Sequence, residues 1–217
     1  MPVFSRDGRV ILYIHIPKSG GSSIEKVAKE AGWSESFSVR GKSLKELTYY
    51  KATLQHLHAD ILNMLFNLEE FDSIFTVVRN PFSRLKSEYY WQRSQRITRL
   101  GVDEWIDDTF TKYKKNNFIY DNHIRPQVEF VPKCNHVEIF KLEENAIEKT
   151  KHLFSKLTPK TSQCDLLKRS LIAKFSGNII QEKKSVKDPE VEAKFQIYHS
   201  DIVDLYKEDF AFFSYEI

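Results

Sequence analysis

Residues 14–24, IHIPKSGGSSI, join an apolar stretch of the chain to a polar one within a few positions. The apolar run at 10–15 predicts a short buried strand, and residues 22–31 predict a helix. Between them, two glycines let the backbone approach a ligand closely. The first amides of the helix, together with its dipole, favour negative charge at this point. The stretch therefore predicts an anion site on a strand–turn–helix unit, as in an α/β protein.

The side chains of this turn indicate which anion chemistry it serves. We expect contacts from all seven of its residues, Pro17, Lys18, Ser19, Gly20, Gly21, Ser22 and Ser23. Lysine supplies a positive charge and the serines supply hydroxyl donors, so the expected ligand carries a phosphate or a sulfate. The phosphate loop G-x-x-x-x-G-K-[ST] places lysine after its glycines. Here Lys18 comes first, which disfavours a nucleotide hydrolase or kinase.

A second anion motif follows the apolar strand pattern at 73–78, SIFTVV. The next residues, 79–87, read RNPFSRLKS, in which Asn80 suits a helix N-cap and proline suits the first helical position. Arg79 at the strand end and Ser87 in the helix can grip one phosphate group from two sides. Open α/β sheets bind ligands at the carboxyl ends of their strands. The chain therefore predicts two anion sites at one edge of a sheet.

In their order, these segments resemble the sulfotransferases that use 3′-phosphoadenosine 5′-phosphosulfate (PAPS). The stretch 15–23, HIPKSGGSS, is similar to the family's 5′-phosphosulfate loop, and 79–87 is similar to its 3′-phosphate motif. The order of segments over 53–91 looks most like that of carbohydrate sulfotransferases. The resemblance implies a three-layer, mainly parallel sheet related to that of P-loop nucleotide kinases. It also implies PAPS as donor, 3′-phosphoadenosine 5′-phosphate (PAP) as product and a saccharide hydroxyl as acceptor. No metal is expected to be required, because lysine and the helix dipoles already supply positive charge.

Sulfuryl transfer needs a base for the acceptor proton, and histidine has a pKa near working pH. The stretch 55–60, QHLHAD, lies where the resemblance places the catalytic histidine. Matching to members with a single histidine favours His56, and matching to members with H-x-H favours His58. Lys18 is the expected charge neutraliser of the leaving phosphate. His15, on the strand before the loop, is expected to orient that loop.

Other candidate residues have weaker sequence context. His123 and Gln127, in NHIRPQ at 122–127, are expected near the acceptor or cofactor, with a hydrogen-bonded turn as the alternative. Arg93 begins a group of arginines that can meet an anionic acceptor or simply end a solvated helix. Lys184 and Ser185 occupy the place where the resemblance expects a loop over the nucleotide. Two rival functions stay open: a nucleotide kinase or hydrolase, and a non-catalytic module that binds a bisphosphonucleotide or an anionic glycan.

Composition sets wider bounds on the protein. The 217 residues are enough for one α/β domain over 1–217, and the alternation of strand and helix patterns predicts a mainly parallel sheet. A formal charge of +3 is too small for a dedicated nucleic-acid binder. The two cysteines cannot form a structural zinc site by themselves. We see neither a signal peptide nor an apolar run near the length of a membrane span, so a cytoplasmic enzyme is expected.

The pattern also predicts the remaining elements. Strands are expected at 73–78 and 137–141, and helices at 60–67, 81–91, 102–114, 146–157 and 190–206. The last helix is expected to be long, with one apolar stripe along it. Segment 33–39 fits a short strand, and 43–50 fits a loop or a short helix.

Overall fold

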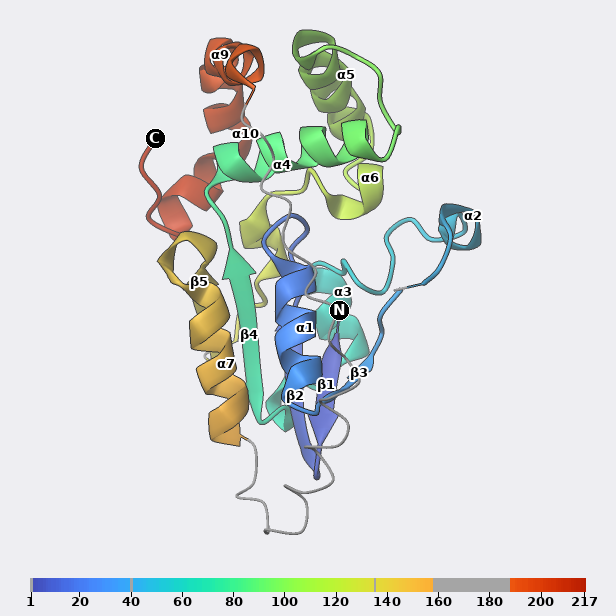
Figure 1. Cartoon of the computed structure of the whole chain (residues 1–217), viewed down its shortest axis with the longest axis vertical. Helices are drawn as coiled ribbons and strands as arrows, with labels where there is room; N and C mark the ends of the chain where they lie inside the picture. The colour runs from blue at the N-terminus through green and yellow to red at the C-terminus, as the bar shows by residue number, and fades with distance from the viewer. Residues whose placement is uncertain (1, 40, 135, 158–187) are drawn as a thin grey trace.

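The computed structural model describes residues 2–39, 41–134, 136–157 and 188–217 (Figure 1). Among these residues, five strands form one sheet in the order β3-β1-β2-β4-β5. Strand β2 pairs in parallel with β4, and β4 with β5, whereas β1 pairs antiparallel with both β2 and β3. The strands are β1 Val3–Arg6, β2 Arg9–Ile14, β3 Ser34–Ser36, β4 Ser73–Val78 and β5 Val137–Lys141. The predicted α/β class with a mostly parallel sheet is therefore confirmed.

The hairpin of β1 and β2 was not among the sequence predictions. Its turn is Asp7-Gly8, in which both residues have positive φ, 49° and 81°. A two-residue Asp-Gly turn with left-handed φ values matches the twist of an antiparallel pair. The pair Arg6 and Arg9 closes the register at this turn. The hairpin adds an antiparallel strand beside the parallel set and places β2 inside the sheet.

Helices occur close to most of the predicted positions. They are α1 Gly21–Glu30, α2 Leu44–Leu47, α3 Ala59–Leu65, α4 Pro81–Ser94, α5 Val102–Lys115, α6 Ile119–Asn122, α7 Ala146–Leu157, α9 Pro189–Ile197 and α10 His199–Phe212. Short 3-10 turns lie at Leu68–Glu70, Gln127–Phe130 and Leu142–Glu144. In the described part of the chain, no helix combines the length and the apolarity needed to cross a membrane.

The single long helix predicted at 190–206 is wrong. The chain forms two helices, α9 and α10, which meet at Tyr198. Helix α9 packs against α5 and, through Phe195 and Tyr89, also against α4, and α10 packs against α4. At the junction, the ring of His199 stacks on Phe82 with centroids 4.7 Å apart. Both halves of the apolar stripe lie in the cluster that α9 and α10 share with α4 and α5, and the helical backbone is interrupted between them at Tyr198, with φ −87° and ψ 17°.

Both faces of the sheet carry apolar clusters. On one face, residues of β2 and β4 such as Tyr13 and Phe75 pack with α1 and α7. On the other face, residues such as Leu12 and Ile74 pack with Leu62 of α3 and with Phe130. Alternation along β2 and β4 supplies both faces, since successive side chains point to opposite sides of a strand. Burial on both faces explains why these strands are continuously apolar.

A third cluster joins α4, α5, α9 and α10 beyond the carboxyl end of β4 (Figure 1). Its centre includes Trp105 and Tyr206, which are both almost fully buried. The Trp105 indole N–H donates to Gln92 Oε1 at 2.9 Å, which fixes α5 on α4. The helical cluster and the sheet therefore enclose the strand ends where both anion motifs lie.

Candidate active site

The turn between β2 and α1 has the backbone of an anion loop. Strand β2 ends at Ile14, and α1 begins at Gly21 with no acidic residue in its first turn. Lys18 and Gly20 have left-handed φ values of 65° and 88°. Glycine adopts this region at no steric cost, whereas a lysine there stores strain of the kind found at functional sites. The helix thus presents its first amides beside Lys18 without a competing carboxylate in that turn.

Gly21 is required because of a side chain beneath the loop. A Cβ at Gly21 would lie 1.8 Å from His15 Nε2, so only glycine lets this imidazole pack so closely. His15 is buried, and its Nδ1 lies 3.3 Å from Glu25 Oε1. Burial lowers the pKa of His15, although the hydrogen bond with Glu25 opposes the shift. A neutral imidazole therefore lies directly beneath the loop, and its expected role in orienting the loop stays a prediction.

Lys18 lies partly buried, with its Nζ 4.9 Å from the ring centre of Trp91. Burial lowers the pKa of Lys18 to about 8; the charge of Glu88 opposes this shift, and that of Arg79 adds to it. A bound anion would favour the charged amine and raise the pKa again. The protonation of Lys18 should therefore depend on whether an anion is bound in the loop.

The second anion motif contacts the first directly. Asn80 caps α4, because its side chain accepts from the Ser83 N–H at 3.2 Å. Just before this cap, Arg79 Nη1 donates to the carbonyl of Lys18 at 3.2 Å. Ser87 lies in the second turn of α4 and is half-buried. The structure therefore brings the two sequence motifs together at the carboxyl ends of β2 and β4.

Gln127 lies fully buried beneath both motifs. Its Oε1 accepts from the Arg79 N–H at 2.9 Å and from the Ser19 hydroxyl at 3.3 Å, and its Nε2 donates to the Arg79 carbonyl at 2.8 Å. Asp209 of α10 in turn accepts from the N–H of Gln127 at 2.9 Å and from that of Val128 at 2.9 Å. One carboxamide thus ties the anion loop, the end of β4 and α10 to one another.

Sequence reasoning passed over Arg84, which is almost fully buried in α4. Its Nε donates to the Pro17 carbonyl at 3.1 Å, and its Nη2 donates to the His123 carbonyl at 2.9 Å. Its partners are main-chain oxygens from segments far along the chain, so no local pattern points to it. Arg84 connects the anion loop to the segment that carries His123.

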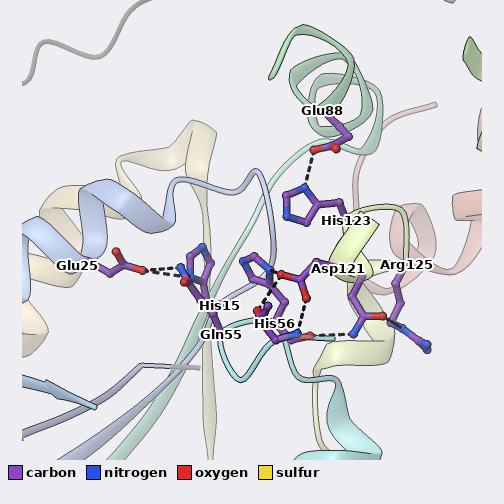
Figure 2. Close-up of polar contacts among 10 residues, drawn as sticks. His15, Glu25, Gln55, His56, Glu88, Asp121, His123 and Arg125 are labelled. Atoms are coloured by element: carbon purple, nitrogen blue, oxygen red, sulfur yellow. Dashed lines mark hydrogen bonds and ion pairs between the residues drawn. The ribbon is translucent and has the colours of Figure 1, made fainter. Parts of the chain in front are cut away.

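His56 faces the same region and is held by Asp121 (Figure 2). The His56 Nδ1 lies 2.7 Å from Asp121 Oδ2, and that oxygen also accepts from the Thr53 hydroxyl at 2.8 Å. Burial lowers the pKa of His56 to about 3, against the opposing effect of Asp121. Burial alone would raise the pKa of Asp121, but the hydrogen bond and charge of His56 and the Thr53 amide lower it to about 2. The pair is therefore a neutral imidazole beside a carboxylate, with the proton on Nδ1 and the lone pair on Nε2.

The segment that carries Asp121 is strained. Tyr120, Asp121 and Asn122 have successive left-handed φ values of 50°, 58° and 63°. Each such residue costs about 1–2 kcal/mol in an L-amino-acid chain. The side-chain amide of Asn122 donates to the His56 carbonyl at 2.8 Å, and Asp121 contacts the ring. The segment therefore holds both the backbone and the ring of His56. No sequence pattern singled out Asp121, since its distance along the chain from His56 hides the pairing.

His58 has a different setting. It is the N-cap residue of α3, and its ring packs against Phe118 with centroids 5.5 Å apart. Its Nδ1 is buried and finds no hydrogen-bond partner among the described residues. Burial lowers the pKa of His58, and the charge of Arg125 adds to this shift. The rings of His56 and His58 thus have different surroundings. His56 Nδ1 has the Asp121 carboxylate at 2.7 Å, whereas His58 Nδ1 has no such partner among the described residues.

His123 lies on the other side of His56. Its ring centroid is 5.0 Å from that of His56 and 5.2 Å from that of Trp91. Its Nδ1 lies 2.7 Å from Glu88 Oε2, and Glu88 is fully buried in α4 (Figure 2). Since Trp91 also faces Lys18, aromatic contacts run from the anion loop to His56.

Arg93, Lys184 and Ser185 are the remaining candidates. Arg93 donates to the carbonyls of Arg99 and Leu100, and it lines a surface hollow of about 200 Å³ with Arg96, Thr98 and Arg99. Lys184 and Ser185 lie outside the described residues.

Comparison with known proteins bears on this site. A model of the family described as "Sulfotransferase family" matches residues 2–216, which is nearly the whole chain. Searches of curated proteins and of solved structures returned no match. The family match covers the anion loop, the motif at 79–87 and the His56 segment together. From its sequence and the arrangement of these groups, the chain belongs to the sulfotransferase family.

Proposed function

We propose that the protein transfers the sulfuryl group of PAPS to a carbohydrate hydroxyl, with His56 as the base. The observation that carries this proposal is the contact between Arg79 and the Lys18 carbonyl, 3.2 Å apart. It joins two anion sites into one, which suits a nucleotide with phosphate groups at both its 5′ and 3′ positions. In this assignment Lys18 to Ser23 hold the phosphosulfate, and Arg79 with Ser87 holds the 3′-phosphate. The proposal includes the P-loop-like, single-domain architecture implied by the sequence resemblance.

The proton and the sulfuryl group move in opposite directions. The acceptor oxygen forms a bond to sulfur while the bond from sulfur to the phosphate oxygen breaks, nearly in line. His56 Nε2 takes the acceptor proton, because its Nδ1 already donates to Asp121. The imidazolium that forms lies 2.7 Å from a carboxylate that stabilises it. The leaving phosphate gains negative charge, which Lys18 and the first amides of α1 neutralise.

His56 is preferred to His58 on the basis of orientation. A base needs a fixed tautomer and a partner for its developing charge. Asp121 supplies both to His56, whereas the buried Nδ1 of His58 has no hydrogen-bond partner among the described residues. His58 remains the alternative base to be tested by substitution.

The test of donor identity is calorimetric titration of PAP and of ADP without magnesium. PAP should bind the wild type at least tenfold more tightly than ADP, a difference of about 1.4 kcal/mol. Arg79→Ala should remove most of this difference, because it removes the guanidinium assigned to the 3′-phosphate. Arg99→Ala is the matched control, since it removes the same charge from the segment between α4 and α5 and should preserve the preference.

Equal affinities for PAP and ADP, or binding that requires magnesium, would contradict the proposal and favour a nucleotide kinase or hydrolase. Transfer of labelled sulfate from PAPS to a panel of oligosaccharides then tests the acceptor class. Tight PAP binding with no transfer to saccharides, phenols or peptides would indicate a binding module instead.

A further inference from the structure

Glu88 and His123 form a buried pair to which the proposed reaction gives no part so far. Glu88 is fully buried in α4, where it accepts from His123 Nδ1 at 2.7 Å and from Gln92 Nε2 at 2.8 Å. Burial alone would raise the pKa of Glu88, but the charge and the hydrogen bond of His123 lower it below its ordinary value. A buried carboxylate is costly unless an opposite charge and hydrogen bonds compensate it. A protonated His123 would supply both.

His123 lies between the two groups assigned to the two ends of the transfer. Its ring centroid is 5.0 Å from that of His56, the proposed base. On its other side it is 5.2 Å from the ring of Trp91, whose centre lies 4.9 Å from Lys18 Nζ. In-line transfer places sulfur between the acceptor oxygen, near the base, and the leaving oxygen, near Lys18. His123 therefore flanks the path of the sulfuryl group.

The orientation of the His123 ring points the same way. Figure 2 shows one ring nitrogen turned to Glu88 and the other turned away from it, towards the side of the site where His56 lies. Nδ1 is the nitrogen that meets Glu88, so Nε2 faces the site, and it forms no hydrogen bond among the described residues. The other charged or titratable groups around this ring are His56 with Asp121, His15, Lys18 and, at the His123 carbonyl, Arg84.

We propose that His123 donates its Nε2–H to an oxygen of the sulfuryl group during transfer, as an imidazolium that Glu88 stabilises. This inference rests on the proposed function. The carboxylate at Nδ1 and the sulfuryl oxygens at Nε2 both favour the positively charged ring. A charged donor fixed beside the group in transit stabilises its negative oxygens without reorganisation. His123 keeps both of its ring protons throughout, whereas His56 must be neutral in order to take the acceptor proton.

Nitrogen-15 NMR of the histidine rings is the first test, because it distinguishes an imidazolium from a neutral ring independently of any activity. The probe is inorganic sulfate, added to the full chain with PAP bound, since sulfate can occupy the place of the transferred group. Sulfate should give His123 two protonated ring nitrogens and leave His56 with one. Glu88→Gln should return His123 to a neutral ring at the same pH. Comparison with His123→Gln assigns the signals.

Kinetics provides the second test. His123→Gln should lower turnover with PAPS by about 10²- to 10³-fold, as does the loss of one preorganised donor, while PAP affinity stays within about twofold. PAP carries no sulfuryl group, so a residue that contacts only this group should not change its binding. His152→Gln, which changes an exposed histidine on α7, is the matched control and should change neither quantity.

A His123 ring that stays neutral with PAP and sulfate present, or that does not respond to sulfate, would overturn the proposal. So would a His123→Gln enzyme that keeps more than half of the wild-type turnover. A loss of PAP affinity as large as the loss of turnover would also overturn it, since His123 would then act on the nucleotide and not on the sulfuryl group. Failure to find any acceptor would count against the proposed function and would leave the NMR result unchanged.

Discussion

At the scale of single residues, the site depends on groups that fix the protonation state of a neighbour. Asp121 lies 2.7 Å from His56 Nδ1 and thereby leaves the lone pair of the neutral ring on Nε2. Asp121 itself lies in a left-handed segment, which costs free energy that other contacts must offset. Two hydrogen bonds supply such contacts. Asp121 accepts from the Thr53 hydroxyl, and the side-chain amide of Asn122 donates to the His56 carbonyl. Strain maintained beside a proposed base is typical of functional sites.

Replacing Asp121 with asparagine tests this orientation. Asp121→Asn keeps the size of the side chain but removes the charge, so His56 loses both its fixed tautomer and the partner for its imidazolium. We expect turnover to fall by roughly 10²-fold or more, within the range for general base catalysis, while PAP affinity stays within about twofold. Asp60→Asn, on neighbouring α3, is the control. Steady-state kinetics with PAP calorimetry separates the two effects, and unchanged turnover would remove Asp121 from the mechanism.

Lys18 allows a prediction about pH. Burial lowers its pKa to about 8 in the empty site, and a bound phosphate should raise it. Above pH 8 the ligand must therefore bind together with a proton, so PAP affinity should fall towards tenfold per pH unit. Calorimetry in two buffers with different ionisation enthalpies would measure this proton uptake.

Lys18→Ala should abolish the proton uptake and lower turnover by about 10²- to 10³-fold, as does the loss of one preorganised electrostatic donor. Lys26→Ala, on the exposed side of α1, is the control. A Lys18→Ala variant with more than half of the wild-type turnover would exclude Lys18 from charge neutralisation.

At the scale of elements, two strand–helix units and the C-terminal helix form one frame. The first unit is β2 with α1, and the second is β4 with α4. Gln127 joins the two units through Ser19 and Arg79, and Asp209 of α10 holds Gln127 in place. Buried polar groups of this kind specify geometry only when every member is satisfied. Gln127 thus contacts both sequence motifs from beneath, and we expect it to set the spacing of the two proposed anion sites.

Gln127→Glu tests this frame. The change keeps the side-chain shape but removes the donor to the Arg79 carbonyl and places a second carboxylate beside Asp209. We expect PAP to lose at least tenfold in affinity while ADP loses less, because the spacing of the two sites matters only for a ligand that fills both. Gln196→Glu, on the exposed side of α9, is the matched control.

A double-mutant cycle with Asp209→Asn should show coupling, because the two side chains contact each other. Additive effects, or equal losses for PAP and ADP, would show that Gln127 does not set the spacing.

At the scale of the whole molecule, the buried histidines link stability to pH. Burial lowers the pKa of His56 to about 3 and also lowers the pKa values of His15 and His58 below 6.5. Below pH 6.5 the unfolded chain binds protons at these sites that the folded chain does not bind. Stability therefore rises with pH in this window and is lost as the pH falls from about 6.5 towards 3.

Thermal melting between pH 7.5 and 5 should reveal this linkage. Each histidine that stays neutral in the folded state contributes up to about 1.4 kcal/mol of lost stability per pH unit. His56→Gln should flatten the dependence, since glutamine does not titrate, whereas His152→Gln should leave it unchanged. A melting temperature independent of pH in this range would contradict the neutral state assigned to His56.

The sequence by itself determined the elements and motifs whose signals are local. The glycines and Lys18 of the loop, the Asn80 cap and the apolar alternation of β2 and β4 all follow from residues within a few positions of one another. These signals predicted the α/β class, the sulfotransferase resemblance and the edge at which the anion motifs meet. They failed for the long C-terminal helix, because a stripe of apolar residues does not reveal that the helical backbone is interrupted at Tyr198.

Only the tertiary structure decided how distant residues act on each other. Asp121 meets His56, Glu88 meets His123, and Gln127 meets both Ser19 and Arg79, across separations of 35 to 108 positions. Such pairs leave no periodicity or spacing in the sequence, since hydrogen bonding depends on position in space and not on order along the chain. Burial, which lowers the pKa values of Lys18 and His56, is likewise a property of the packed molecule. The sequence therefore indicates which functional groups are present, and the packing of the molecule determines the charge state of each group.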